Sequence, residues 1–207
     1  MSGLSQAQQI AHHSDEAHAT STGISHNKIM MWAFLASDCM FFGSFIMTFM
    51  VYRGKAAGGP RPQDIWDIPY TSVSAAVLLL SSLAIVLALT YLQRGNERAF
   101  RIWLVATAAL GLMFLGGQFY EFTTFYHDGL TLHSSLFGST FFVLTGFHGT
   151  HVAIGVIWLL SLAWLSKKGK IPPSRSEMPE IAALYWHFVD IVWIIIFAVV
   201  YLIPYKS

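Results

Sequence analysis

The stretch YTSVSAAVLLLSSLAIVLALTYL, from Tyr70 to Leu92, contains no charged residue and decides the fold class. About 20 predominantly apolar residues cross a bilayer as one helix, because each residue adds about 1.5 Å along the helix axis. The stretch is continuously apolar rather than alternating between apolar and polar residues, which excludes a strand of a closed membrane barrel. It therefore predicts a membrane-spanning helix.

Four other stretches share this length and character, so that the expected spans are residues 29–52, 70–92, 102–125, 137–165 and 181–203. Of the 207 residues, 55% are hydrophobic and only 11% are charged, whereas a soluble domain carries about 25% charged residues. We therefore predict an all-α, polytopic membrane protein with a five-helix transmembrane domain in residues 29–207. Residues 1–28 are a polar tail that lacks the apolar core of a signal peptide.

The charged residues between the spans predict an orientation, because short cytoplasmic loops are enriched in lysine and arginine. With the N-terminus in the cytoplasm, eight cations lie inside: Lys28, Arg94, Arg98, Arg101, Lys167, Lys168, Lys170 and Arg175. Four lie outside: Arg53, Lys55, Arg61 and Lys206. We expect a cytoplasmic N-terminus and an outer C-terminus, with Pro60, Pro69, Pro172, Pro173 and Pro179 in the loops.

Composition excludes several other classes of protein. The formal net charge is +1, so no strong field would attract nucleic acid. The chain has one cysteine, Cys39, which rules out a disulfide within the chain and a four-thiolate metal site.

Ionisable residues inside the expected spans are the candidate functional residues, because a charge in the bilayer is costly unless it is paired or neutral. They are Asp38, Glu121, His148, His151, His187 and Asp190. All except Glu121, which is near the outer surface, are expected near the bilayer middle. His148 and His151 share a helix face, as do His187 and Asp190, since each pair is three residues apart. We predict a buried polar cluster that joins the first, fourth and fifth spans.

Three interpretations of this cluster compete. Histidines facing each other from the fourth and fifth spans would suit a haem or metal site. A chain of acids and imidazoles would suit a proton relay. The third interpretation, which the residues favour, is a set of interhelical hydrogen bonds that holds the helices together, helped by small residues such as Gly111 and Gly155.

Three stretches carry a resemblance to a known family. They are GQFYEF at residues 117–122, FGSTFFVLTGFHGTHV at residues 137–152 and YWHFVDIVW at residues 185–193. Together they resemble subunit III of haem-copper oxidases, and a looser likeness extends from about residue 28 to 204 and includes SDCMFF at residues 37–42. Five spans resemble the shorter bacterial form of this subunit.

The resemblance implies a subunit without its own catalytic, cofactor-binding or metal residues, which stabilises the catalytic subunit I, its proton uptake and bound phospholipids. Haem and copper are expected in partner chains, and Asp38 matches the carboxylate that the family links to proton uptake. The expected partners are subunits I and II, a small subunit IV, lipids and a respiratory supercomplex. The expected location is the bacterial inner membrane.

The leading hypothesis is therefore subunit III of a proton-pumping cytochrome c oxidase. A quinol oxidase subunit and an accessory subunit of nitric oxide reductase belong to the same family. A free-standing transporter is the alternative of a different class, although the spans lack the central prolines that broken transporter helices favour.

Overall fold

The computed structural model describes residues 25–53, 68–133, 135–171 and 177–203. Its helices are α2 (His26–Tyr52), α4 (Ile68–Gln93), α5 (Glu97–His127), α6 (Leu136–Lys167) and α7 (Glu177–Phe197), which continues as the π-helical turn η2 (Ala198–Leu202). By length and composition, five helices in this part of the chain can cross a membrane. The predicted all-α architecture with five spans is confirmed, and the orientation of the termini stays a prediction.

The helices begin earlier than the apolar stretches because their first turns are polar or contain proline. Pro69 and Pro179 were expected in loops, but they lie in the first turns of α4 and α7. That expectation is wrong because the N–H groups of the first helical turn have no hydrogen-bond partner within the helix. Proline, which lacks this N–H, therefore loses no helical hydrogen bond there. Asn96 caps α5 by accepting a hydrogen bond from the Ala99 N–H at 3.1 Å. The other expected loop prolines and most of the predicted polar tail, residues 1–24, lie outside the described residues.

The chain forms two compact units, residues 1–39 and 40–207, and the boundary between them falls within α2. In the first unit, Ser25 caps α2: its carbonyl accepts from the Ile29 N–H at 3.2 Å and its hydroxyl from the Lys28 N–H at 3.4 Å. Trp32 and Met30 in this unit are exposed, as expected of side chains that contact lipid.

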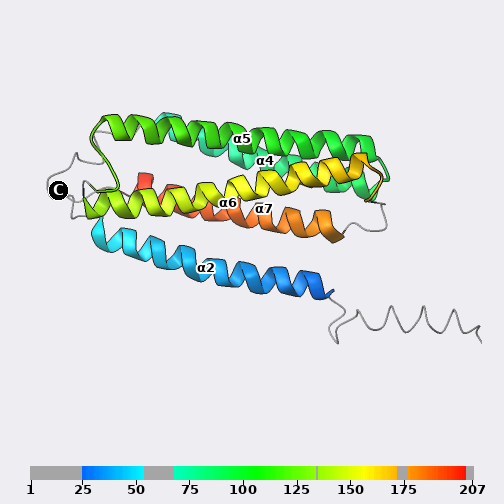
Figure 1. Cartoon of the computed structure of the whole chain (residues 1–207), viewed down its shortest axis with the longest axis horizontal. Coiled ribbons are helices and arrows are strands. Elements are labelled where there is room, and N and C mark those ends of the chain that lie inside the picture. The colour runs from blue at the N-terminus through cyan, green and yellow to red at the C-terminus, as the bar shows by residue number, and fades with distance from the viewer. Residues whose placement is uncertain (1–24, 54–67, 134, 172–176, 204–207) are drawn as a thin grey trace, which may run out of the picture. The chain divides into compact units, whose positions relative to one another are not determined.

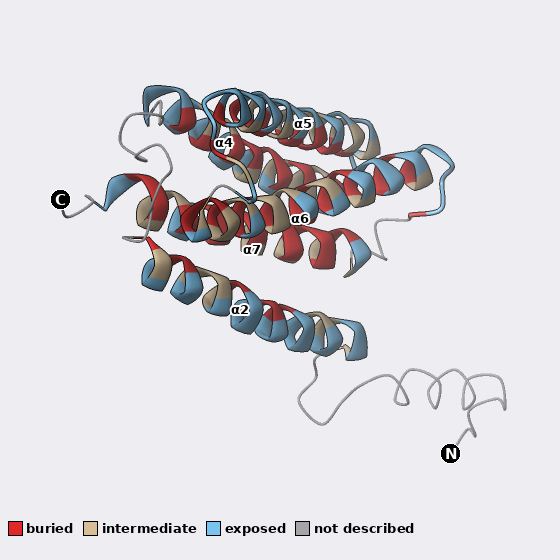
Figure 2. Cartoon of the chain, turned by 60° about the vertical axis from the view of Figure 1, so that its left-hand side comes forward, coloured by how far each residue is buried: buried red, intermediate tan, exposed pale blue. Residues whose placement is uncertain are grey.

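In the second unit, α4, α5, α6 and α7 lie side by side, and successive helices run in opposite directions (Figure 1). Contacts of α4 with α5, α5 with α6, α6 with α7 and α7 with α4 close these helices into a bundle. The short connection between α4 and α5 permits only antiparallel neighbours. Buried residues line the inner sides of these helices and exposed residues their outer sides (Figure 2).

Trp186 forms the centre of this bundle. It is fully buried, and its indole Nε1 donates to Ser81 Oγ on α4 at 2.8 Å. A Cβ atom added to Gly111 on α5 would lie 2.6 Å from Trp186 Cη2, and one added to Gly155 on α6 would lie 2.8 Å from Cζ3. The two glycines therefore admit the indole ring between α5 and α6, as expected for small residues at helix contacts in membranes.

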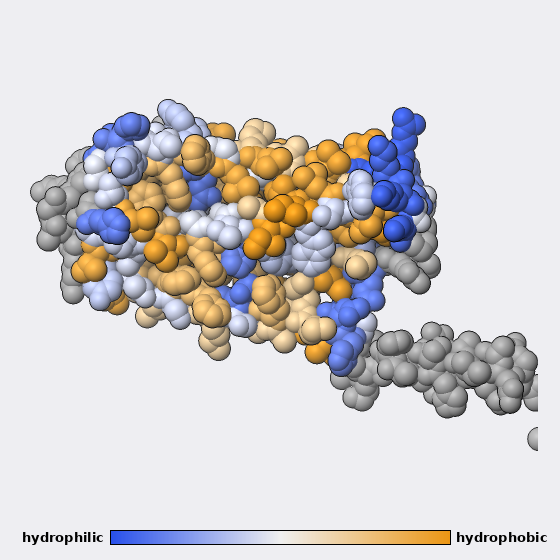
Figure 3. Space-filling model, viewed as in Figure 1, coloured by the Kyte–Doolittle hydropathy of each residue, from blue (hydrophilic) through white to orange (hydrophobic). Residues whose placement is uncertain are grey.

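The surface of the second unit differs between the middle and the ends of the helices. On the face seen in Figure 3, hydrophobic residues dominate the middle, and strongly hydrophilic residues gather at the end where α5 begins and α6 ends. Arg101 Nη1 on α5 donates to the Ser166 carbonyl on α6 at 3.4 Å, which places both helix termini at this end. We call this the basic end, because it carries Arg94, Arg98, Arg101, Lys167 and Lys168.

Candidate functional site

Ser82 on α4 joins two candidate residues of α7. Its hydroxyl donates a hydrogen bond to Asp190 Oδ2, and its oxygen lies 3.1 Å from His187 Nδ1. A hydroxyl has a single proton, so the proton in the contact with His187 comes from Nδ1. His187 Nε2 is then a hydrogen-bond acceptor. Asp190 is buried, and its Oδ1 has no hydrogen-bond partner among the described residues.

Glu121 on α5 forms a second polar contact at the end of the bundle opposite the basic end. Its Oε1 accepts from Thr71 Oγ1 on α4 at 2.7 Å and from the Tyr201 hydroxyl in η2 at 3.2 Å. The buried carboxylate thereby links three helical segments. Arg53 lies at the same end, where it donates to the Ile203 carbonyl just after η2. A cation is stabilised at that position by the carbonyls at a helix C-terminus.

The two histidines of α6 pack among aromatic rings. His148 is fully buried, stacks on Trp193 with a centroid distance of 4.9 Å and meets the edge of Phe114 at 5.9 Å. Neither of its ring nitrogens has a hydrogen-bond partner among the described residues. His151 Nδ1 lies 2.9 Å from the Phe147 carbonyl, so this nitrogen carries the proton.

The contacts of the cluster that was predicted to join the first, fourth and fifth spans are described only in part. His187 and Asp190 share a face of α7 as expected, but their partner is Ser82 of the second span, which the prediction did not include. Glu121, which was expected apart from the other candidates and near the outer surface, meets Thr71 and Tyr201. Asp38 belongs to the first unit, so its place beside the histidines of α6 stays a prediction. Among the described residues, no three His, Cys, Asp or Glu side chains form a group that could hold a metal.

Gln118 adds a polar contact that sequence reasoning did not identify. Its Nε2 donates to the Thr145 carbonyl on α6 at 2.8 Å. A Cβ added to Gly149 would lie 2.8 Å from Gln118 Oε1, so glycine at this position provides room for the amide. A glutamine within an apolar span was the signal available in the sequence, as were Ser82 and Thr71 within the second span.

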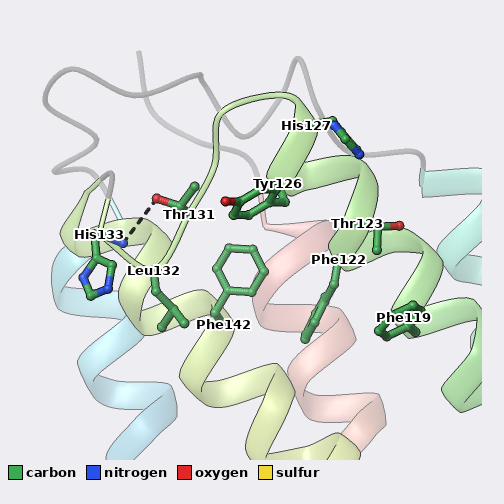
Figure 4. Close-up of a pocket in the computed structure, with 9 residues that line it drawn as sticks. All are labelled: Phe119, Phe122, Thr123, Tyr126, His127, Thr131, Leu132, His133 and Phe142. Atoms are coloured by element: carbon green, nitrogen blue, oxygen red, sulfur yellow. Dashed lines mark hydrogen bonds between the residues drawn. The ribbon is translucent and has the colours of Figure 1, made fainter.

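Two apolar pockets lie between α5 and α6, one near each end of the bundle. The first, with a volume of about 410 Å³, is lined by Phe119, Phe122, Thr123, Tyr126, His127, Thr131, Leu132, His133 and Phe142 (Figure 4). The second, of about 510 Å³, is lined at the basic end by Arg101, Ile102, Val105, Leu160, Ala163, Trp164 and Lys167. Both volumes suit a small molecule or part of a lipid.

Comparison with known proteins shows the family. The family described as cytochrome c oxidase subunit III matches residues 7–205. The chain belongs to this family. A quinol oxidase subunit 3 of Bacillus spizizenii is 38% identical to it over 85% of this chain and 86% of the relative. A cytochrome c oxidase subunit 3 of Bacillus sp. (strain PS3) is 36% identical over 90% of each chain. A cytochrome bo(3) ubiquinol oxidase subunit 3 of Pseudomonas aeruginosa is 36% identical over 96% and 94%.

This protein is therefore subunit III of a haem-copper oxidase, a multi-pass membrane protein that associates with other subunits of an oxidoreductase complex. The chain covers 86 to 94% of each of these relatives, so it is similar to them in length. The relatives are named for both quinol and cytochrome c, so the sequence-based preference for cytochrome c stays a prediction.

Proposed function

We propose that this subunit III is a non-catalytic scaffold that stabilises the catalytic subunit I, its proton uptake and bound phospholipids in a bacterial plasma membrane. The observation that carries the proposal is the way in which Asp190 and Glu121 accept hydrogen bonds from hydroxyl groups on other helices. Polar side chains that bond across helices help to hold membrane helices together. Acids used in this way serve packing rather than redox chemistry.

The aromatic surroundings of the α6 histidines support the same role. His148 is enclosed by Trp193 and Phe114, and His187 turns to Ser82 on α4. A haem with two histidine ligands would require the rings of α6 and α7 to face each other. We propose that haem and copper are bound by the partner subunits, with subunit I as the direct neighbour.

The charge distribution supports an N-terminus in the cytoplasm. Arg94 and Arg98 follow α4 and open α5, and Lys167 and Lys168 end α6, so these cations gather at one end of the bundle. The basic end would then face the cytoplasm. On this orientation, Glu121 and the pocket of Figure 4 lie toward the outer surface.

The two pockets support the proposal that the subunit holds phospholipids. The pocket at the basic end places Arg101 and Lys167 beside apolar side chains such as Ile102 and Leu160. Basic pockets between membrane helices on the cytoplasmic side bind anionic lipid head groups. The pocket at the other end combines phenylalanines with His127 and His133, which could contact a head group above an acyl chain.

The test is gentle purification of the tagged chain from its native membranes, followed by mass spectrometry of the accompanying chains. We expect the chain to co-purify with oxidase subunits whose haem spectrum is independent of it. After separation from those subunits, the chain should show no Soret band. A Soret band in the separated chain, or recovery of the chain without any oxidase subunit, would disprove the proposal.

A further inference from the structure

Ser82 and His187 form a polar spot on the outer side of the bundle. Both side chains are only partly buried, whereas Asp190 behind them is buried. Four aliphatic side chains one or two turns from them are exposed: Leu79 by 46%, Val86 by 45%, Ile191 by 56% and Ile194 by 46%. We call these residues, together with Ser82 and His187, the α4–α7 face. Residues three, four or seven apart lie on one side of a helix.

This polar spot lies deep in the membrane. Ser82 is near the middle of the 26-residue helix α4. His187 is about ten residues from the start of α7, or ~15 Å along its axis, and its contact with Ser82 places the two at the same depth. The hydrocarbon core of a bilayer is about 30 Å thick. The spot is therefore close to the middle of the hydrocarbon region.

Lipid tails cannot satisfy the polar groups at this depth. With Nδ1 engaged by Ser82, His187 Nε2 is an acceptor that needs a donor, and Asp190 Oδ1 behind it has no partner among the described residues. Intramembrane polar residues almost always face protein or a water-filled cavity. The exposed leucine, valine and isoleucine side chains of this face are suited to packing against another helix.

The opposite side of the bundle has a different character. At comparable depth, the exposed residues of α5 and α6 include the apolar side chains of Leu112, Met113, Ile154 and Ile157. Thr150 on α6 is also exposed, but its hydroxyl donates to the Gly146 carbonyl of its own helix at 2.9 Å. The two pockets described above are on this α5–α6 side. The polar spot thus distinguishes the α4–α7 face from a face that lipid alone can cover.

We propose that the α4–α7 face is the docking surface for a transmembrane helix of another oxidase subunit, which supplies a hydrogen-bond donor to His187. The occupant is a helix rather than lipid because lipid tails carry no hydrogen-bond donor, whereas a polypeptide brings a donor side chain such as serine, threonine, asparagine or tryptophan to this depth. This inference rests on the proposed function, since it requires assembly of the oxidase.

The test places a photoreactive amino acid at Ile191, beside His187, in the tagged full-length chain within native membranes. Illumination should produce an adduct between this chain and another oxidase subunit, identified by mass spectrometry. The matched control carries the same group at Ile157, which is 66% exposed on α6. It should yield lipid adducts and no subunit adduct.

Three results would overturn the docking proposal while the oxidase still co-purifies: only lipid adducts or none at Ile191, crosslinks from Ile191 to residues 25–39 of the same chain, or equal crosslinking of both positions to one subunit. Loss of all oxidase subunits from the purified, unmodified chain would instead disprove the proposed function, so the two failures are distinguishable.

A second measurement examines the hydrogen bond. His187→Leu should lower the fraction of the chain retained with the complex in detergent roughly 3- to 15-fold, the range expected for one interhelical hydrogen bond. His187→Gln, which can still accept, should retain more than His187→Leu. Equal retention of the two variants and the wild type would contradict a hydrogen bond to the partner.

Discussion

Hydroxyl groups on α4 are the partners of two buried carboxylates on other helices. Asp190 accepts from Ser82, and Glu121 accepts from Thr71 and from Tyr201. A buried acid that loses a donor keeps the cost of its desolvation without the compensating bond. The hydroxyls of α4 therefore determine how much free energy the burial of these two carboxylates costs.

Thr71→Val tests this role because valine keeps the shape of threonine and removes only the hydroxyl. We expect the variant to lower the unfolding free energy by about 1 to 2 kcal/mol, as one donor to a buried carboxylate is lost. Denaturation by SDS in mixed micelles measures the change. Thr90→Val is the control, since the Thr90 hydroxyl is bonded to the Val86 carbonyl of its own helix at 2.9 Å, and it should change stability by less than about 0.5 kcal/mol. If both substitutions change the unfolding free energy equally, the hydrogen bond from Thr71 to Glu121 makes no special contribution to stability.

Asp38 is the residue for which the resemblance to the family implies a functional effect. We expect Asp38→Ala to leave the haem spectrum of the complex unchanged and to shorten the working life of the oxidase during turnover. Oxygen consumption followed until activity decays measures this lifetime. Asp128→Ala is the matched control, because Asp128 is an exposed carboxylate at the C-terminal cap of α5. If the Asp38 and Asp128 variants decay alike, Asp38 has no part in protecting the enzyme.

Close packing of α5, α6 and α7 depends on glycines that face Trp186. Gly111 on α5 leaves no room for a Cβ, whereas a Cβ at Gly116 on the same helix would have no atom within 4 Å. The indole cannot retreat easily, because it is fully buried and its Nε1 is bonded to Ser81. These glycines therefore have different roles despite their nearness in sequence.

Gly111→Ala should thus destabilise the bundle, while Gly116→Ala should not. Overpacking a dense core typically costs about 1 to 3 kcal/mol, and alanine in an open helical position gains up to about 1 kcal/mol over glycine. The same SDS titration, with Trp fluorescence as the signal, compares the two variants. A neutral Gly111→Ala would show that helices α5 and α7 separate more readily than their packing indicates.

The number and approximate limits of the helices follow from the sequence because hydrophobic length is a strong signal in a membrane protein. The partners of the polar residues do not follow, since lipid-facing and core-facing sides of such a helix are both apolar. Nothing in the pattern around Ser82 or Thr71 indicates that they turn toward α7 and α5. The starts of α4 and α7 were predicted too late because Pro69 and Pro179 were interpreted as loop residues. Both prolines lie in the first turn of a helix, where proline is accepted.

The whole molecule has one strongly basic end, and this asymmetry predicts its orientation. In a Cys39→Ser background, Asp128→Cys in the α5–α6 connection should react with a membrane-impermeant maleimide added to intact cells. Lys168→Cys at the end of α6 should react only after the membrane is opened. The expected difference follows from retention of cations on the cytoplasmic side. Labelling of the Lys168→Cys variant in intact cells would show that the orientation is opposite to the proposed one.

The basic end also predicts which lipid the molecule retains. The double substitution Arg101→Gln and Lys167→Gln removes both cations that line the pocket there. Each basic side chain near a membrane surface contributes about 1 kcal/mol toward anionic lipid. Removal of two such side chains should therefore make the purified oxidase retain that lipid about thirtyfold less tightly. The control, Arg94→Gln with Arg98→Gln, removes the same charge at the same end from residues that do not line the pocket. Native mass spectrometry with added phosphatidylglycerol distinguishes the two variants. Equal losses of lipid affinity in the two variants would mean that general surface charge attracts the lipid. A loss confined to the pocket variant would mean that the apolar pocket and its two cations bind the lipid together.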